Sequence, residues 1–478
     1  MADCDCDESK DNSFGNADDL ALARESMVLV QRSESSRQSV TIFPREIQVQ
    51  ILRHLDWKSL MNLRGTNCYY RGIVGECQDI WKTHHDGRWN NGKCRDTWLA
   101  SRGLKYWSRT KNWMLHAEKI EDGNWFNEFL RRSRLDQSVH LKLLKLIVEH
   151  SQSNDVWYDL MVHGKDIVDC LKRIIAKERE RNTSLPGRIG VCSPLQVTGE
   201  KVLMGISRCI ALQEWKFLHE VKIAERVQLE DGAMAIAKFY ESVDDILTHD
   251  SIHQFEEYVL YELERLANII KNRLTARSYA SVEAKHPTMD VVEEMKFLFD
   301  VTSANDEAFR GNVDDYYDPK NSLISQCLRR KTGIPITLAV IYTSIVRRVC
   351  DIQMDIIGLP GHIVVGVPFD GIHNSSRVFI DPFNGGRILS YVDCSEIVTR
   401  YNISFHPDMV TPISNEKVWQ RMVGNLIHSH SMQETEDDND DGFFFSLRFL
   451  LSDYALVITN FHELVSAPGW CLQPVPFL

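Results

Sequence analysis

An apolar segment followed by three β-rich runs most constrains the fold that this sequence can adopt. The segment, residues 334–349, follows a glycine and ends beside a pair of arginines, which complement the negative end of a helix dipole. The three runs, residues 353–359, 363–369 and 377–383, are rich in the Val, Ile and Phe residues that favour strands. The pattern therefore predicts one buried helix and, after it, a small antiparallel sheet.

The second and third runs are separated by a polar loop, residues 371–376, as in a hairpin. Pairing about that loop brings positions near 362 and 381 opposite each other, so that His362 faces Asp381. A carboxylate beside an imidazole fixes the tautomer of the ring and raises its basicity. We therefore predict a His–Asp pair in the sheet.

Four short motifs stand in order along this stretch. They are YYDPKNS at residues 316–322, GIPITL at 333–338, PGH at 360–362 and FIDPFNGG at 379–386. Together they resemble the transglutaminase-like domain of a bacterial family named after an invasion regulator. The order of helix, strand with His and strand with Asp is similar to the papain-like transglutaminase core. The candidate pocket that follows from the resemblance holds Asn321, Pro335, His362 and Asp381.

The resemblance also implies where a catalytic cysteine would stand. Active members of the family begin the helix with Gly-x-Cys-x-x-x-Ala, and here Pro335 occupies the cysteine position between Gly333 and Ala339. Proline carries no nucleophile, although it suits the first turn of a helix. Cys350 would lie ~22 Å away at the other end of the helix, because a helix rises ~1.5 Å per residue. Cys327 precedes the helix, and nothing in the sequence aims it at the histidine.

We therefore expect no cysteine-based catalysis, with the His–Asp pair kept as a polar brace or as part of a binding pocket. The alternative is a hydrolase or acyltransferase that uses His362 and Asp381. Its attacking group would be a displaced thiol, such as that of Cys327, or an activated water.

A second helical pattern occupies residues 41–85. Apolar residues recur at helical spacing over residues 47–55, after a proline and a glutamate in the first turn, and two more short helices are expected at residues 60–63 and 68–74. About 45 residues are too few to bury all of these apolar side chains among themselves. Part of the apolar face is therefore expected to contact a partner.

This pattern resembles an F-box, a family that begins with Leu-Pro-x-Glu, continues with Ile-Leu-x-x-Leu and ends in a tryptophan. Phe43 replaces the first leucine, and both side chains are large and apolar. Any small helical bundle remains the alternative, since leucines at these spacings are common. The resemblance implies that this unit binds the SKP adaptor of a cullin–RING ubiquitin ligase through Pro44, Ile47, Ile51, Leu52, Leu55, Leu63 and Trp81.

Composition bounds the rest of the sequence. Its 478 residues suit about three domains. A net charge of −12 argues against nucleic acid or an anionic membrane as the main partner, and no apolar run suggests a membrane span. The 12 cysteines include no CxxC pair, so we expect no metal site, no cofactor and a reducing compartment, the cytosol or the nucleus.

The expected fold class is mainly α with a small antiparallel sheet (α+β). Within the middle of the sequence, helices are expected at residues 138–149, 164–181 and 200–214, with a loop at 182–199. The expected domains are an acidic disordered tail (1–40), the F-box unit (41–85), a helical linker region (86–216), the transglutaminase-like domain (217–465) and a C-terminal tail (466–478).

An F-box joined to this domain resembles the F-box only protein 21 class of ligase receptors. Members of that class often continue into a small barrel that binds hemimethylated DNA, and we expect this chain to end before such a barrel. The resemblance implies a substrate-recognition subunit of an SCF-type ubiquitin ligase that captures an unknown protein. Plain scaffolding without ligase assembly is a further alternative.

Overall fold

A computed structural model gives the structure of the protein. It describes residues 43–89, 124–148, 156, 159–160, 163–184, 192–220, 227–249, 254–278, 287–300, 305–368 and 377–433. The predicted tails at 1–40 and 466–478 and the predicted hairpin loop at 371–376 lie outside the described residues.

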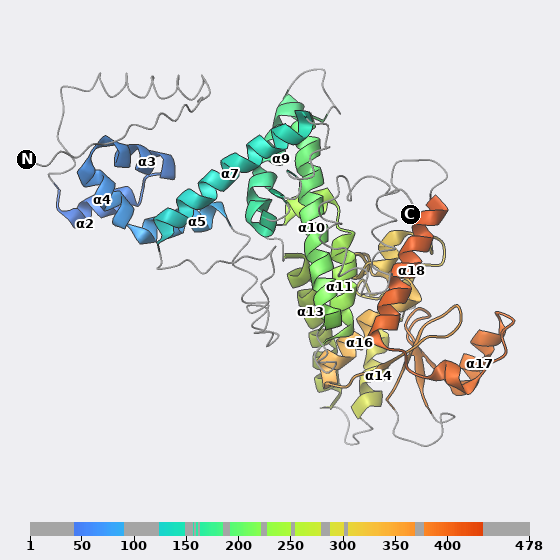
Figure 1. Cartoon of the computed structure of the whole chain (residues 1–478). Coiled ribbons are helices and arrows are strands. Elements are labelled where there is room, and N and C mark those ends of the chain that lie inside the picture. Colours follow the sequence, from blue (N-terminus) through green and yellow to red (C-terminus); the bar gives the residue numbers. More distant parts are fainter. Residues whose placement is uncertain are drawn as a thin grey trace, which may run out of the picture. The chain divides into compact units, whose positions relative to one another are not determined.

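The protein divides into two compact units, which are described separately. The first contains the described residues 43–85 and 124–126, and the second contains the other described residues. The first unit is built from four short consecutive helices (Figure 1): α2 (Arg45–Leu52), α3 (Trp57–Thr66), α4 (Cys68–Glu76) and α5 (Gln78–Arg88). The last three residues of α5 belong to the second unit.

Polar caps set the helix boundaries in the first unit. The side chain of Asp56 accepts a 2.7 Å hydrogen bond from the backbone N–H of Ser59, and that of Asn67 accepts one of 2.9 Å from Tyr70. Each bond satisfies an orphan donor at a helix start, which is worth about 1 kcal/mol. The break that the sequence places between the first two helices is therefore confirmed, and it has a capping residue as its cause.

A buried tryptophan closes the first unit. Trp81 is fully buried, its indole Nε1–H donates a 2.7 Å hydrogen bond to the carbonyl of Val74, and its ring centroid lies 5.0 Å from that of Phe126. Leu52 and Leu60 are also buried. The hydrogen bond satisfies the one polar atom of the ring, so the indole can act as the anchor of this small core.

The second unit opens with long helices. The α9 helix packs on α10, and α10 packs on α11 (Figure 1). The helices that precede the candidate site are α7 (Trp125–Val148), η4 (Gly164–Ile167), α9 (Val168–Ser184), α10 (Pro194–Glu220), α11 (Leu229–Phe239), α12 (Val243–Thr248), α13 (Gln254–Ser278) and α14 (Pro287–Phe299).

Helix α16 (Pro335–Cys350) lies at the centre of the core. Every residue from 335 to 346 is buried. The helix contacts α11, α13, α14, α15 (Ile324–Arg330) and α18 (Asn415–Gln433). A helix that is apolar all round needs partners on all sides. The apolar segment that the sequence shows at 334–349 is thus confirmed as a buried helix.

The sheet has four antiparallel strands in the order β3 (Asp355–Ile357), β4 (Val364–Gly366), β5 (Phe379–Asp381) and β6 (Arg387–Leu389). Its two faces bury different cores. Ile356, Val365 and Ile380 join the core around α16, whereas their neighbours along each strand pack with residues of α17 (Tyr391–Thr399). Alternation of side chains along each strand explains this division.

Of the remaining elements, η5, α15 and α18 contact α16. Strand β1 (Arg310–Gly311) pairs in parallel with β2 (Thr332–Gly333), and the last described helix, α18, contacts both α11 and α16. The bounds of these elements and their neighbours are η5 (Pro319–Ser322), α15 (Ile324–Arg330), η7 (Pro407–Val410) and α18 (Asn415–Gln433).

The predicted fold class, mainly α with a small antiparallel sheet, is confirmed. The helix bounds in the linker region are corrected: α7 begins before residue 138, at Trp125, and α10 begins inside the predicted loop, at Pro194. Proline misled the loop prediction because it is tolerated in the first turn of a helix. No helix among the described residues is long and apolar enough to span a membrane.

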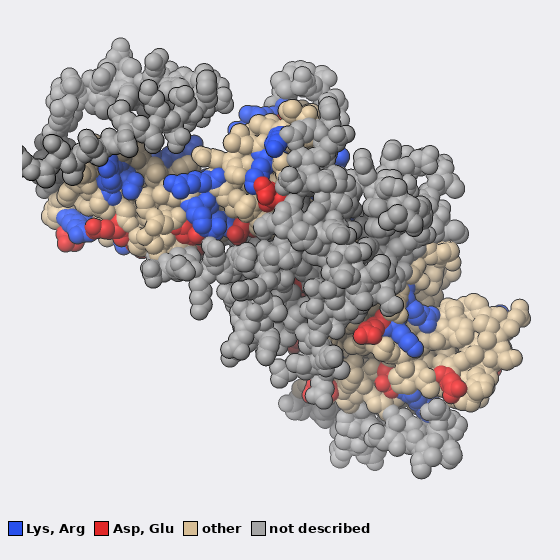
Figure 2. Space-filling model, in the orientation of Figure 1, with Lys and Arg blue, Asp and Glu red and all other residues tan. Residues whose placement is uncertain are grey.

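Charge is mixed on the visible surface of the N-terminal helices. Figure 2 shows Lys and Arg side chains there beside Asp and Glu, with uncharged residues between them. Two ion pairs of the first unit, Arg45 with Glu76 and Arg53 with Asp79, are of this exposed kind. Such pairs contribute little to stability.

Candidate functional site

A tight turn places His362 beside the sheet. The preceding Gly361 has φ of +69°, a left-handed conformation that favours glycine, and a Cβ there would lie 2.4 Å from the ring of Tyr401. The backbone N–H of His362 donates a 3.2 Å hydrogen bond to the carbonyl of Leu359. The PGH motif is therefore a turn whose geometry holds the histidine at the start of β4.

His362 and Asp381 form the predicted pair. Nε2 of the ring lies 2.9 Å from Oδ2 of the carboxylate. Asp381 also accepts a 2.7 Å hydrogen bond from the side-chain amide of Asn384 and bonds from the backbone N–H groups of Phe383 and Asn384. Burial favours the neutral acid, but these bonds outweigh it and lower the pKa of Asp381, with that from His362 as the largest of them.

The strand register brings the pair together in a slightly different way from the predicted one. Val365 pairs with Ile380, so the position directly across from Asp381 is residue 364, not 362. The histidine reaches the carboxylate diagonally from the turn that precedes β4. Diagonal neighbours on adjacent strands lie within reach of a ring side chain.

A cavity of about 570 Å³ opens beside this pair. Its polar lining comes from Tyr316, Tyr317, His362, Arg421, Asn425 and His428. Its apolar lining comes from Val313, Pro335, Ile336, Ile363 and Phe383, and Gly361 and Tyr401 complete it. A volume of this size and a mixed lining are typical of ligand sites.

Pro335 stands at the first turn of α16 and lines this cavity. No thiol lines it, since the described cysteines lie elsewhere. Cys327 is fully buried, its Sγ–H donates a 3.1 Å hydrogen bond to the carbonyl of Asn321, and burial raises the pKa of its thiol. Cys350 is the last residue of α16. The geometry thus gives the histidine no cysteine partner among the described residues.

Asn321 is fully buried but does not line the cavity. Its side-chain amide donates a 2.7 Å hydrogen bond to the carbonyl of Asp315, and its side-chain oxygen accepts one of 3.3 Å from Asn312. It therefore braces the loop that carries Tyr316. Of the four predicted pocket residues, Pro335 and His362 line the cavity, Asp381 bonds the histidine from behind, and Asn321 supports the rim.

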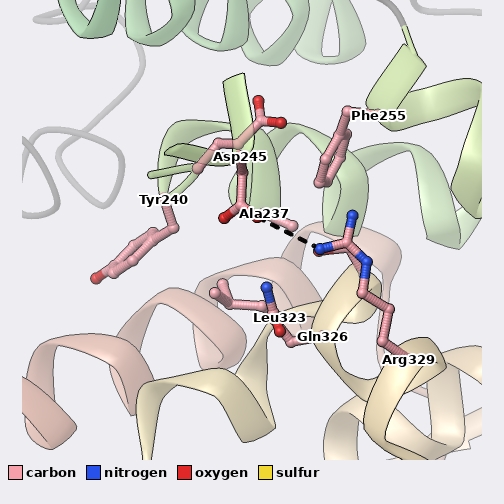
Figure 3. A pocket seen from close by; sticks show the side chains of 9 residues that line it. Ala237, Tyr240, Asp245, Phe255, Leu323, Gln326 and Arg329 are labelled. Carbon is pink, nitrogen blue, oxygen red and sulfur yellow. Dashed lines mark ion pairs between the residues drawn. The ribbon is translucent and has the colours of Figure 1, made fainter. Parts of the chain in front are cut away.

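A second cavity lies among α11, α12, α13 and α15 and is much smaller (Figure 3). Its volume is about 20 Å³, which suits a single water. Across it Arg329 pairs with Asp245, with the two atoms 3.5 Å apart. No group of three or more potential metal ligands occurs among the described residues. A third cavity, of about 340 Å³, is lined by residues of α13 alone. The 570 Å³ cavity is the candidate site because His362 of the His–Asp pair lines it.

Comparison with known proteins identifies the region that carries this site. Residues 257–424 match the family model described as the transglutaminase-like superfamily. Two bacterial proteins named UPF0162 protein, from two strains of Xylella fastidiosa, are 37% identical over 209 residues and 35% identical over 220 residues. The matches cover 42% and 45% of this chain and 64% and 67% of the bacterial proteins. The protein contains a transglutaminase-like domain related to the UPF0162 proteins.

The transglutaminase-like domain also has more distant eukaryotic relatives. F-box only protein 21 of Mus musculus is 26% identical over 209 residues, and that of Homo sapiens is 23% identical over 214 residues. Each match covers 41% of this chain and 31% of the relative. The match thus spans under a third of those proteins and about two thirds of the bacterial ones. No solved structure matches this protein.

Sequence reasoning did not place α18 at the site of the transglutaminase-like domain. Arg421, Asn425 and His428 line the cavity from this helix. Their spacing of four and then three residues puts them on one helix face, which is the signal that could have found them. Tyr316, which opens the first sequence motif, reaches the same cavity.

The seven residues predicted to bind an adaptor all lie in the first unit. Ile47 and Ile51 are 46% and 38% exposed on α2, and Pro44 is exposed just before it. Leu52 and Trp81 are buried within the unit. Leu55 and Leu63 are partly buried. The exposed members could contact a partner directly, whereas the buried ones hold the helices in place.

Proposed function

We propose that this protein is a binding subunit of a cullin–RING ubiquitin ligase. In this proposal the N-terminal helices dock on an SKP adaptor, and the transglutaminase-like domain holds a target protein in its 570 Å³ cavity. The observation that carries the proposal is the position of Pro335, which lines the cavity at the start of α16 where the family resemblance expects the nucleophile. A site with the acid–base pair but without the thiol can bind without forming an acyl enzyme.

The N-terminal helices support the docking half of the proposal. Phe43, Ile47 and Ile51 are 50%, 46% and 38% exposed. Ile47 and Ile51 are four residues apart and lie on one side of α2, and Phe43 lies just before that helix. An exposed apolar stripe on a short helix is a feature of helix-to-helix interfaces. The relatives named F-box only protein 21 supply the class of partner.

Co-purification with the SKP adaptor tests the docking half. The substitution Ile51→Asp places a charge in the exposed stripe and should abolish co-purification. Gln50→Asp is the matched control, because Gln50 is exposed on the same helix outside the stripe. The proposal fails if the unmodified protein does not bind the adaptor, or if both variants behave alike.

A second candidate function is hydrolysis or acyl transfer, which the 2.9 Å contact between His362 and Asp381 favours. His362 would accept a proton from water while the water oxygen attacks an acyl carbon, and would then return the proton to the leaving group. Turnover of acyl esters by the purified protein, lost in His362→Ala, would support this function. Thiol-probe labelling of Cys327 that depends on His362 would support its cysteine-based form.

A further inference from the structure

The guanidinium of Arg421 is the one cationic side chain of arginine or lysine type among the described residues that line the cavity. It is partly buried, and its Nη1 packs so closely on Gly358 that a Cβ there would lie 2.7 Å away. Its Nη2 donates two long hydrogen bonds, of 3.4 Å to the carbonyl of Leu359 and 3.5 Å to that of His362. Both acceptors are neutral.

Other partly buried arginines of the same unit have carboxylate partners. Arg265 pairs with Glu307 at 2.7 Å, and Arg348 pairs with Glu230 at 2.9 Å. No described carboxylate lies within ion-pair distance of Arg421. Burial lowers the pKa of its guanidinium, with only a partial offset from Tyr316. A partly buried cation without a counter-ion is costly, and an anionic ligand would offset that cost.

The rest of the lining also suits an anion. None of the described lining residues is acidic, and Asp381 lies behind the imidazole of His362. Asn425 and Tyr316 also line the cavity, and their side chains carry an amide and a hydroxyl. Pro335, Ile336 and Ile363 form an apolar part of the lining and would contact an apolar group on the same ligand.

We infer that the cavity of the transglutaminase-like domain recognises a peptide carboxylate, which pairs with Arg421 while an adjacent apolar side chain lies against the start of α16. The inference rests on the proposed function in that the cavity binds a protein segment. A planar guanidinium binds a carboxylate through two parallel hydrogen bonds, which gives orientation as well as affinity. The carboxylate could belong to the C-terminus of a polypeptide or to an acidic side chain.

Peptide pools of matched composition distinguish these sources. Four pools of short peptides are used, and each peptide carries a neutral fluorophore at the N-terminus. The randomised positions exclude Asp and Glu in all four pools. One pool has a free C-terminal carboxylate, one a C-terminal amide, and the other two are amides with either Glu or Gln fixed at the centre. Fluorescence anisotropy with the full-length protein should show at least about tenfold tighter binding for one carboxylate pool than for its neutral counterpart.

The variant Arg421→Gln should bring the two pools of that pair within about twofold of each other, because it removes the charge and the fork of donors. Arg71→Gln is the control, since Arg71 is an exposed arginine of the first unit and makes the same change in net charge. Arg421→Lys keeps the cation and should lose at least about threefold of the preference, since an ammonium cannot bind bidentately. It serves as the second variant if Arg421→Gln does not fold.

The inference is overturned if no carboxylate pool binds better than its neutral counterpart, or if the preference survives both changes at Arg421. Two further measurements distinguish failure of this inference from failure of the proposed function. They are co-purification with the adaptor and mass analysis of the peptides recovered after incubation. A carboxylate preference with peptides consumed would overturn the non-catalytic proposal alone. Adaptor binding without a carboxylate preference would overturn this inference alone.

Discussion

Nε2 of His362, in the turn before β4, lies 2.9 Å from Oδ2 of Asp381 on β5. That contact uses one ring nitrogen of His362, whose side chain also lines the cavity. The carboxylate is only 2% exposed and also accepts hydrogen bonds from Asn384. Several hydrogen bonds thus hold the Asp381 carboxylate, so its protonation affects the fold as well as any chemistry.

Asp381→Asn should destabilise the protein at neutral pH by about 1–3 kcal/mol, because it leaves donors aimed at a weaker acceptor. The folded state lowers the pKa of Asp381, so the carboxylate contributes stability above its unfolded pKa of about 3.9, and that contribution is lost as pH falls through the lower folded value. Urea unfolding over a pH series should therefore show the difference between the two proteins shrinking in acid. Asp314→Asn, at an exposed position, should show no such difference. A difference in unfolding free energy between the unmodified protein and Asp381→Asn that stays constant with pH would contradict the prediction.

Gly361→Ala should cost about 1–2 kcal/mol, because φ is +69° at this position. The added Cβ would also meet the ring of Tyr401, which is 53% exposed and can move aside. Thermal unfolding of Gly361→Ala alone and combined with Tyr401→Ala separates the two effects. We expect most of the loss to remain in the combined variant, and full recovery there would show that the clash, not the backbone, was responsible.

Two glycines on packed helices should respond in opposite ways to alanine. A Cβ at Gly232 of α11 would lie 2.2 Å from the ring of Trp419, so Gly232→Ala should force α11 and α18 apart and cost at least about 1–3 kcal/mol. A Cβ at Gly424 of α18 would meet nothing within 4 Å, so Gly424→Ala should stabilise the protein by about 0.5–1 kcal/mol. Urea unfolding measures both, and equal signs would contradict the packing of α18.

Cys327 should resist modification in the folded protein. Its thiol is fully buried, and burial raises its pKa, so little thiolate is present at neutral pH. Under native conditions iodoacetamide should modify the exposed Cys68 and Cys192 and leave Cys327 untouched, whereas urea should expose all three. Peptide mass spectrometry gives the result. Rapid native labelling of Cys327 would favour the cysteine-based interpretation of the site.

Local pattern sufficed to predict the elements around the site. The Pro335 start of α16, the order of β3, β4 and β5, and the contact between His362 and Asp381 follow from apolar runs and turn residues that stand close together in the sequence. The fourth strand, β6, was not predicted. The cavity as a whole did not follow. Arg421 reaches it from a helix far beyond the turn in the sequence. Its spacing from Asn425 and His428 indicates a shared helix face, but not which cavity that face lines.

Short elements were missed for a related reason. Strands β1 and β2 have two residues each, and their parallel pairing joins Arg310 to Thr332 across an intervening helix and loop. Two residues carry no detectable alternation. The docking half of the proposed function remains a prediction from the motif beginning at Pro44.

The buried carboxylate of Glu230 ties α11 to α16. Glu230 is 1% exposed, contacts the guanidinium of Arg347, pairs with Arg348 at 2.9 Å and accepts a 3.0 Å hydrogen bond from Ser344. Glu230→Gln keeps the volume but leaves two arginines without their shared counter-charge, so it should cost about 3–5 kcal/mol. The control is Glu264→Gln. Glu264 is 51% exposed and lies 3.8 Å from Arg348, so this change should cost at most about 0.5 kcal/mol. Urea unfolding of the two variants gives the comparison, and similar losses would mean that the buried carboxylate is not what couples α11 to the central helix.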